Sequence, residues 1–287
     1  MKPSNLDALA KLEIAVVGVT RNGARFLAQE IARLRQATSA FGTVHALVIE
    51  SDSSDSTLTV LHEAARAWPA LRYKSLGELR EGLPQRTVRI AHCRNTYLDE
   101  LTNNPVYAGV SHVIVADLDR VCTDITAQAL ASCWAAPEPW DACTSNQGDH
   151  YYDIWALRHE VWCPGDAWDD HARLLPVLGE PEATNVALFS RMVHIPADRP
   201  MIEVQSAFGG LAVYRREALL NARYVGADTD GRELCEHVPL HAAIRRAGGR
   251  IFINPALINA RHTKHGGRKG FWRTQRRHLW AWLKSFA

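Results

Sequence analysis

The first 120 residues alternate between short β-branched runs and helical stretches, and this alternation restricts the possible folds more than any other feature. Runs typical of strands are EIAVVGVT (13–20), HALVIE (45–50), LRYKS (71–75) and HVIVAD (112–117). Helical patterns lie between them, over 22–36, 55–68 and about 89–101. Such alternation predicts a mostly parallel sheet covered by helices, whose ligands bind at the carboxyl ends of the strands.

The second half of the chain has a weaker pattern. Residues 141–146 and 151–159 are typical of strand edges, and 162–200 predicts irregular structure with one or two helices. The other elements expected are a strand and a helix over 209–220, a helix over 237–248 that ends at Gly248, and the last strands over 250–260. We find no repeat and no low-complexity linker, so a boundary near 120–140 would separate functions within one domain.

Composition excludes several classes of protein. With 287 residues, 47% of them apolar, the chain can build a full core, and its net charge of +2 argues against a nucleic-acid partner. The six cysteines form no C-x-x-C pair, the start MKPSNLDALAKLE has no apolar signal core, and no apolar run reaches the roughly 18 to 20 residues that cross a bilayer. We expect a cytoplasmic protein with reduced thiols, in which any membrane contact is peripheral at the inner face.

A pair of aspartates ends the strand over 112–117, in IVADLDR. The first strand-to-helix turn, VGVTRNGARF, lacks G-x-G-x-x-G, and no G-x-x-x-x-G-K-[ST] occurs, so neither a dinucleotide fold nor a P-loop is indicated. In an extended segment Asp117 and Asp119 project to one side, where their oxygens could hold Mn²⁺ or Mg²⁺ and, through it, a diphosphate. The alternative for this pair is a solvated turn.

Further motifs accompany the D-x-D pair and give a specific resemblance. The segment VIESDSSDST (48–57) looks like the acidic, Ser-rich nucleotide-binding segment of GT-A glycosyltransferases, and Arg94-Asn95 looks like their R-N pair. In their order along the chain, three later segments resemble the fungal capsule-associated α-1,3-mannosyltransferase family: DACTSNQGDHYYDIWALRH (141–159), SAFGGLAVYRREAL (206–219) and CEHVPLH (235–241). The resemblance covers about residues 14–265.

This resemblance implies a GT-A-like Rossmann-type mixed sheet flanked by helices, and a metal-dependent hexosyltransferase. Residues 1–120 would form the nucleotide-sugar-binding half, 121–265 the acceptor-binding and catalytic half, and 266–287 a basic aromatic tail. GDP-mannose is the donor that the resemblance favours, a UDP-sugar is the alternative, and the acceptor would be a glycan or a lipid-linked molecule of polysaccharide assembly. The sequence departs from the GT-A pattern at Glu50-Ser51, where two aspartates are usual. It also departs at Leu118-Asp119-Arg120, where an asparagine or aspartate near the metal pair is usual.

The ends of the first two strands and the helix before the D-x-D strand should converge on the nucleotide. The donor-binding residues that we expect are Thr20, Arg21, Glu50, Asp52, Arg89, Arg94, Asn95, Asp117 and Lys264, with Arg268 as a further phosphate ligand. The metal ligands would be Asp117, Asp119 and, through the resemblance, His262 in preference to His265. Glu236, before a helix, and Asp153, between aromatic residues, are the catalytic candidates.

Each of these residues also has a structural interpretation. Arg89 and Arg94 could form surface ion pairs with Asp99 or Glu100, Glu236 could cap its helix, and His262 could be solvated. The aromatic residues Tyr152, Trp155 and Phe208 could belong to the core. Two other functions stay open: a sugar nucleotidyltransferase, although the Gly-rich signature after the first strand is missing, and a nucleotide-sugar-binding module without catalysis.

The tail, Arg261 to Ala287, carries only positive formal charges. Trp272, Leu279, Leu283 and Phe286 recur near helical spacing, as in a helix that lies on anionic lipid. The alternative is that this stripe packs on the body of the protein, with its arginines near the diphosphate.

Overall fold

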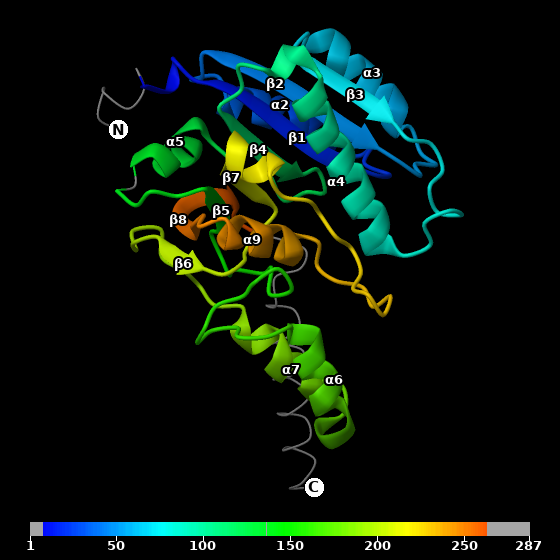
Figure 1. The fold of residues 1–287 in the computed structure, drawn as a ribbon, viewed down its shortest axis with the longest axis vertical. Coiled ribbons are helices and arrows are strands. Elements are labelled where there is room, and N and C mark those ends of the chain that lie inside the picture. Colours follow the sequence, from blue (N-terminus) through cyan, green and yellow to red (C-terminus); the bar gives the residue numbers. More distant parts are fainter. Residues whose placement is uncertain (1–7, 136, 263–287) are drawn as a thin grey trace, which may run out of the picture.

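The computed structural model describes residues 8–135 and 137–262 (Figure 1). Its strands are β1 (Glu13–Thr20), β2 (Thr43–Glu50), β3 (Leu71–Ser75), β4 (His112–Asp117), β5 (Ala142–Gln147), β6 (Ile202–Val204), β7 (Leu211–Arg215) and β8 (Ile251–Ala260). Its helices are α2 (Leu27–Ala37), α3 (Thr57–Ala67), α4 (Arg86–Asn103), α5 (Ala127–Ala135), α6 (Ala167–Leu178), α7 (Glu182–Ala187), α8 (Arg216–Leu220) and α9 (His237–Arg246), with short 3₁₀ turns η1 (Pro105–Tyr107) and η2 (Phe189–Arg191).

The eight strands of the described residues form one mixed sheet in the order β3-β2-β1-β4-β7-β5-β8-β6. Strands β1 to β4 run parallel, β7 is antiparallel to both β4 and β5, β5 is parallel to β8, and β6 closes the edge antiparallel to β8. The predicted strands over 13–20, 71–75 and 112–117 have the observed bounds. The predicted mixed α/β fold is therefore confirmed.

Helices cover both faces of the sheet because the strands alternate their apolar residues between the two sides. In β1, Ile14 and Val16 pack on one side in a core with α2, α3 and α5, whereas Ala15 and Val17 pack on the other with α4 and α9. This period of two is what the sheet geometry requires of a strand buried on both faces.

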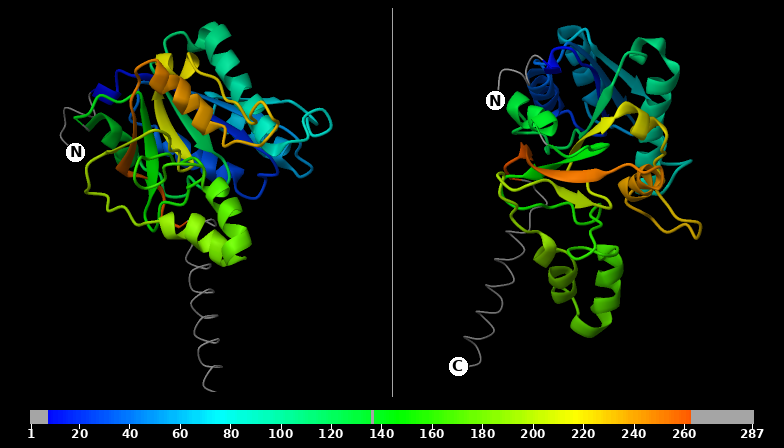
Figure 2. Two further views of the ribbon diagram at one scale, coloured as in Figure 1. Left: turned by 60° about the horizontal axis from the view of Figure 1, so that its bottom comes forward. Right: turned by 60° about the vertical axis from the view of Figure 1, so that its left-hand side comes forward.

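The two helices α6 and α7 pack against each other. They project from the molecule beyond the side of the sheet that ends in β6 (Figures 1 and 2). They fulfil the prediction of one or two helices within 162–200. The strand predicted over 151–159 is wrong. That segment is mostly a loop, in which Arg158 and His159 form isolated β-bridges, because the Asp153 carboxylate accepts hydrogen bonds from the backbone N–H groups of Ala156 and Gly209 and so folds the chain into a turn.

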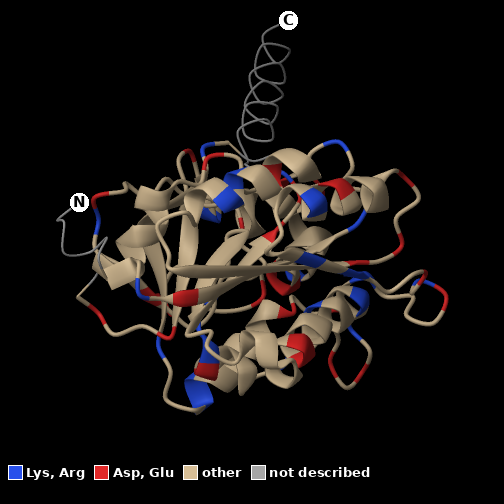
Figure 3. Ribbon diagram, turned by 90° about the horizontal axis from the view of Figure 1, so that it is seen from above, with Lys and Arg blue, Asp and Glu red and all other residues tan. Residues whose placement is uncertain are grey.

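All six cysteines are buried free thiols, as expected. Among the described residues, no helix is long and apolar enough to cross a bilayer. Acidic and basic positions are interspersed along the ribbon (Figure 3).

Candidate active site

The polar ends of three parallel strands meet at one edge of the sheet. Thr20 at the end of β1 is in register with Glu50 at the end of β2, and Val19 is in register with Asp117 at the end of β4. A cavity of about 550 Å³ opens beside these ends. Its lining includes Thr20, Arg21, Asp52, Arg89, Arg94, Asp117, Asp119, Asp153 and Glu236. Nine of the residues predicted for the site thus share one cavity.

Arg94 of α4 connects the two halves of this cavity. Its Nη2 donates to Asp117 Oδ1 at 2.7 Å and its Nε donates to Glu236 Oε1 at 2.9 Å. The side chain is buried, and its guanidinium lies over the rings of Phe208 and Tyr224. Burial lowers the pKa of Arg94, but the charge of Asp117 and its neighbours raises it well above the ordinary value, so the group stays a cation. The surface ion pair considered for Arg94 is therefore excluded.

Glu236 precedes the first residue of α9 but does not cap the helix, because its side chain makes no hydrogen bond to the helix backbone. The carboxylate is buried and its Oε1 is held by Arg94 instead. The capping interpretation of this residue is wrong. The sequence signal that fits the observed position is the resemblance of CEHVPLH.

Asp153 supplies another carboxylate to the same cavity. Desolvation raises its pKa to about 6, although the Gly209 N–H lowers it, and the negative charge of Asp117 adds to the rise. Gly209 has φ of +71°, and a Cβ there would lie 2.7 Å from the Ser145 carbonyl oxygen, so glycine is needed to present this N–H. Asp117, Asp153 and Glu236 are three carboxyl groups around the buried Arg94 guanidinium, and a second buried arginine, Arg89, lines the same cavity.

The other end of the cavity is built from the β2–α3 loop and the start of α4. Asp52 Oδ1 accepts the backbone N–H groups of Leu79 and Arg80, each at 2.9 Å. Its Oδ2 is 3.9 Å from Arg89 Nε, and it accepts no hydrogen bond from the residues that the structure describes. The Thr20 hydroxyl is likewise buried without a described partner. Because an unpaired buried polar atom is costly, both atoms suit a ligand.

Glu50 and Asn95 support this region from outside the cavity lining. Glu50 is buried, with its carboxylate accepting the Ser75 hydroxyl and the Ser53 N–H, so it fixes the loop that carries Asp52. Asn95 exchanges two hydrogen bonds with the backbone of Tyr224. Both residues thus position the site rather than face the cavity in this structure.

Glu30 of α2 was not foreseen from the sequence. It is buried, and its carboxylate accepts the Cys122 N–H at 3.2 Å, which holds the loop after the D-x-D pair. Burial raises its pKa despite hydrogen bonds from that loop, and the charge of Asp119 adds to the rise. An acidic residue within an amphipathic helix is usually exposed, so nothing in the local sequence distinguishes Glu30 from an exposed glutamate.

The D-x-D carboxylates fit a divalent cation that is shared with a ligand. Asp117 and Asp119 both line the cavity, and the Asp117 side chain is 32% exposed. Among residues 8–135 and 137–262, no group of three or more His, Cys, Asp or Glu could hold a metal ion. Two carboxylates are nevertheless sufficient for Mg²⁺-type sites, where phosphate oxygens of the substrate complete the coordination.

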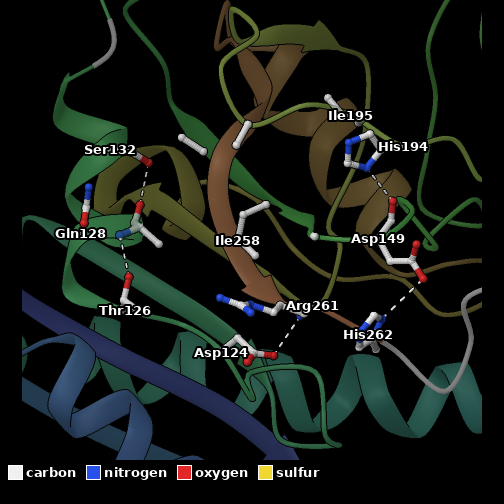
Figure 4. Close-up of a pocket in the computed structure, with 14 residues that line it drawn as sticks. Asp124, Thr126, Gln128, Ser132, Asp149, His194, Ile195, Ile258, Arg261 and His262 are labelled. Atoms are coloured by element: carbon white, nitrogen blue, oxygen red, sulfur yellow. Dashed lines mark hydrogen bonds and ion pairs between the residues drawn. The ribbon is translucent and has the colours of Figure 1, made fainter.

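His262 lies away from this cavity. It lines a second one, of about 620 Å³, where its Nδ1 is 3.5 Å from Asp149 Oδ2 and its side chain is 78% exposed (Figure 4). The structure therefore does not group it with Asp117 and Asp119, and its role as a metal ligand stays a prediction. Lys264, His265, Arg268 and the tail over 266–287 lie outside the described residues.

The predicted core aromatics turn out to be divided between core and site. Phe208 is buried and packs in the core, while Tyr152 and Trp155 are partly buried, and all three line the cavity. The cavity wall also includes Trp168 of α6 and Phe189 of η2. The protruding helices thus contribute apolar surface to the site.

No protein-family model and no curated protein matches the chain. Among solved structures, it is similar to the mannosyltransferase PcManGT from Pyrobaculum calidifontis in complex with GDP-Man and Mn²⁺, with a TM-score of 0.50 and 17% identity over 93% of this chain and 61% of that one. The chain has a GT-A fold.

Two other solved structures are similar at lower scores. S. aureus TarS 1-349 has a TM-score of 0.44 and 11% identity, over 84% of this chain and 58% of that one. Glucosyl-3-phosphoglycerate synthase from Mycobacterium tuberculosis, in complex with UDP, has a TM-score of 0.48 and 14% identity, over 92% of this chain and 76% of that one. The chain spans about three fifths of the length of the first two proteins. The likeness to the capsule-associated family stays a resemblance of sequence.

Proposed function

We propose that the protein is a metal-dependent glycosyltransferase that transfers a sugar from a nucleotide sugar to a hydroxyl group of an acceptor. The observation that carries the proposal is the link from Asp117 through Arg94 to Glu236, which joins the D-x-D strand end to the carboxylates across one cavity. A nucleotide sugar needs these two regions side by side, because its diphosphate and its anomeric carbon are adjacent. We assign residues 1–120 to the donor and 121–265 to the acceptor and catalysis.

The nucleoside would occupy the end of the cavity formed by the first two strands. Asp52 Oδ2, which is ion-paired with Arg89 but accepts no described hydrogen bond, and the Thr20 hydroxyl suit the N–H groups of a base and the hydroxyls of a ribose. Arg89 stands beside Asp52, and Arg21 lines the same wall, where its guanidinium suits a phosphate. Glu50 and Asn95 act through the loops that they hold.

Asp117 and Asp119 would hold Mn²⁺ or Mg²⁺ together with the diphosphate oxygens. When bound, the ion neutralises the negative charge that grows on the leaving diphosphate. Arg94, a buried cation next to Asp117, fixes one carboxylate oxygen and adds positive potential to the same region.

Asp153 and Glu236 are the residues suited to the acceptor side. A pKa of about 6 leaves Asp153 ionised but basic near neutral pH, which suits a group that accepts the proton of an acceptor hydroxyl. Glu236, fixed by Arg94, is suited to accept a hydrogen bond from a sugar hydroxyl and so orient it. The apolar wall with Trp155 and Trp168 suits the faces of sugar rings.

GDP-mannose is the first donor to test, because the sequence resembles a mannosyltransferase family and the P. calidifontis mannosyltransferase was solved with GDP-Man and Mn²⁺. A UDP-sugar is the second. We propose a glycan or lipid-linked acceptor of polysaccharide assembly, with the basic tail in contact with anionic lipid.

Calorimetry with GDP, UDP and CMP, with and without Mn²⁺, tests the nucleotide site, and a hydrolysis screen over sugar nucleotides identifies the donor. We expect one nucleoside diphosphate to bind only with the metal, and its sugar conjugate to be hydrolysed slowly. Tight binding of a nucleoside triphosphate would instead indicate a nucleotidyltransferase. Metal-dependent binding of a nucleoside diphosphate, without hydrolysis or transfer of any sugar, would indicate a nucleotide-sugar-binding module without catalysis.

A further inference from the structure

His237, the first residue of α9, is buried at the wall of the proposed donor cavity with neither ring nitrogen paired. The residue is 2% exposed, and neither Nδ1 nor Nε2 has a hydrogen-bond partner among residues 8–135 and 137–262. The nearest acidic oxygen, Glu236 Oε1, is 3.6 Å from Nε2, which is beyond hydrogen-bond length, and it already accepts from Arg94. Burial lowers the pKa of His237 well below its ordinary value, and the nearby charge of Arg94 lowers it further, so the ring is neutral.

His241 provides an internal comparison, because it is the same residue type one turn along the same helix. It is fully buried, and both its nitrogens are satisfied: Nδ1 by the Ser206 hydroxyl at 2.9 Å and Nε2 by the Tyr214 hydroxyl at 2.8 Å. His241 does not line the cavity, whereas His237 does. The fold thus pairs the ring nitrogens of the histidine in the core, and the histidine that lines the cavity has no hydrogen-bond partner among the described residues.

Packing fixes the orientation of the His237 ring. It stacks on Phe208 with ring centroids 3.7 Å apart and an interplanar angle of 20°, and Tyr224 meets it edge-on at 5.5 Å. A ring held between two aromatic groups cannot turn freely toward water to satisfy its nitrogens. Leaving a buried polar group unpaired is costly, so such a residue is expected where a ligand completes it.

The chemistry of the ring narrows the ligand. A neutral imidazole offers one N–H donor and one nitrogen acceptor, and a sugar hydroxyl both donates and accepts. His237 adjoins Glu236, whose carboxylate Arg94 links to Asp117, so it belongs to the part of the cavity that we assign to the sugar. We infer that His237 binds a hydroxyl group of a sugar ring in the active site. This inference rests on the proposed glycosyl transfer and adds to it a residue that selects among sugars.

The test compares His237→Phe with His241→Phe. Phenylalanine keeps the stacking on Phe208 and removes both nitrogens, so His237→Phe should be as stable as the wild type or more so in thermal unfolding. It should bind the nucleoside diphosphate normally in Mn²⁺ but bind the matching nucleotide sugar, or use the acceptor, about tenfold less well. His241→Phe should show the reverse: a lower Tm, because Ser206 and Tyr214 lose their partners, with unchanged ligand constants.

Two arms identify which sugar is bound. Calorimetry with GDP and GDP-mannose, or with the nucleotide pair that the screen selects, measures how much the donor sugar contributes to affinity. The acceptor KM reports on binding of the acceptor's sugar ring. His237→Asn restores a polar group near Nδ1, and His237→Gln restores one near Nε2. One of the two variants should recover part of the lost affinity, and that variant identifies the ring nitrogen that binds the hydroxyl group. They also serve if the phenylalanine variant does not fold.

The failures are distinguishable. Unchanged nucleotide-sugar affinity and unchanged acceptor KM in a folded His237→Phe protein, with an active wild type, overturn the inference and leave the proposed function intact. A wild type that binds no nucleotide sugar with Mn²⁺ overturns both. A loss of affinity for the nucleoside diphosphate itself would place His237 at the phosphates and would also contradict the inference.

Discussion

The Arg94 guanidinium donates to Asp117 Oδ1 at 2.7 Å, and this contact ties helix α4 to the end of strand β4. The Nε of the same group reaches Glu236 Oε1 at 2.9 Å. Because these charged groups are mostly removed from water, each depends on the others for stabilisation. Removal of the arginine should therefore affect both stability and activity.

The Arg94→Met variant should lose about 3 to 5 kcal/mol of unfolding free energy in urea, since carboxylates stay behind in a buried site without their cation. Arg94→Lys keeps the charge but cannot donate in two directions from a planar group, so it should be less destabilised yet still lose most activity. The control is Arg223→Met, because Arg223 and its partner Asp99 are 52% and 54% exposed and such pairs contribute about 1 kcal/mol or less. Equal stability of the two methionine variants would show that the Arg94 link is unimportant.

Removal of the D-x-D carboxylate tests the metal. Asp119→Ala should keep a cooperative unfolding transition but abolish donor hydrolysis, and exhaustive EDTA treatment of the wild type should do the same until Mn²⁺ is restored. Near-normal turnover in either experiment would remove the metal from the mechanism.

The same assay tests His262. If His262 contributes to the metal site, His262→Ala should raise the Mn²⁺ concentration needed for half-maximal activity, while Asp149→Ala, which removes its observed partner, should not. An equal response of the two variants would assign His262 to the second cavity.

Much of the sheet could be predicted from the sequence, because alternation of apolar residues and strand length are local properties. The convergence of Thr20, Asp52 and Asp117 follows from the topology of parallel strands and was predicted as well. The burial of Arg94 and Glu30 was not, since a charged residue in a helical pattern usually faces water, and only contacts from distant segments bury these two.

The segment 151–159 has the sequence pattern of a strand but does not form one, for a related reason. Its aromatic and β-branched residues favour a strand, but the Asp153 carboxylate competes for backbone N–H groups, one of them from Gly209, 56 residues away. Neither that contact nor the unpaired state of His237 has a signature in the local sequence.

The nucleoside end of the cavity can be tested with a substitution that changes one atom. In Asp52→Asn, the remaining oxygen can still accept from Leu79 and Arg80, while Oδ2, which is 3.9 Å from Arg89 Nε, becomes an NH₂ group. A ligand N–H would then meet a donor, so donor KM should rise about tenfold or more with little change in kcat, and the Tm should fall because the buried Arg89 loses the charge of its partner.

Glu50→Ala is the matching test for a residue that does not line the cavity but holds the loop that carries Asp52. It should raise donor KM more than it lowers kcat and also lower the Tm, because the Ser53 N–H and the Ser75 hydroxyl lose a buried acceptor. Unchanged donor affinity in both variants would move the nucleoside elsewhere.

The basic aromatic tail predicts binding to anionic membranes. Co-sedimentation at low salt should recover more full-length protein with phosphatidylserine-containing vesicles than with neutral ones, and a chain that ends near Gly270 should lose the difference. Raising the salt should weaken binding, since the attraction is screened. Equal binding of both chains, or none by the full-length protein, would contradict the lipid contact.

Asp153 predicts a pH-dependent stability. Its pKa is about 6 in the fold and near 3.8 when unfolded, so between these values the folded state binds more protons than the unfolded state. Stability should therefore fall as pH rises through this window, by about 3 kcal/mol for this group, with the full loss present above pH 6. Asp153→Asn removes the ionisation, and its oxygen can still accept the Gly209 N–H. In EDTA, the variant should exceed the wild type in unfolding free energy at pH 7.5 and lose that advantage toward pH 4.5. Its transfer activity, measured separately with Mn²⁺, should be abolished at both pH values. A variant that is destabilised equally at the two pH values would show that the Asp153 carboxylate is stabilising and is not held ionised at a cost.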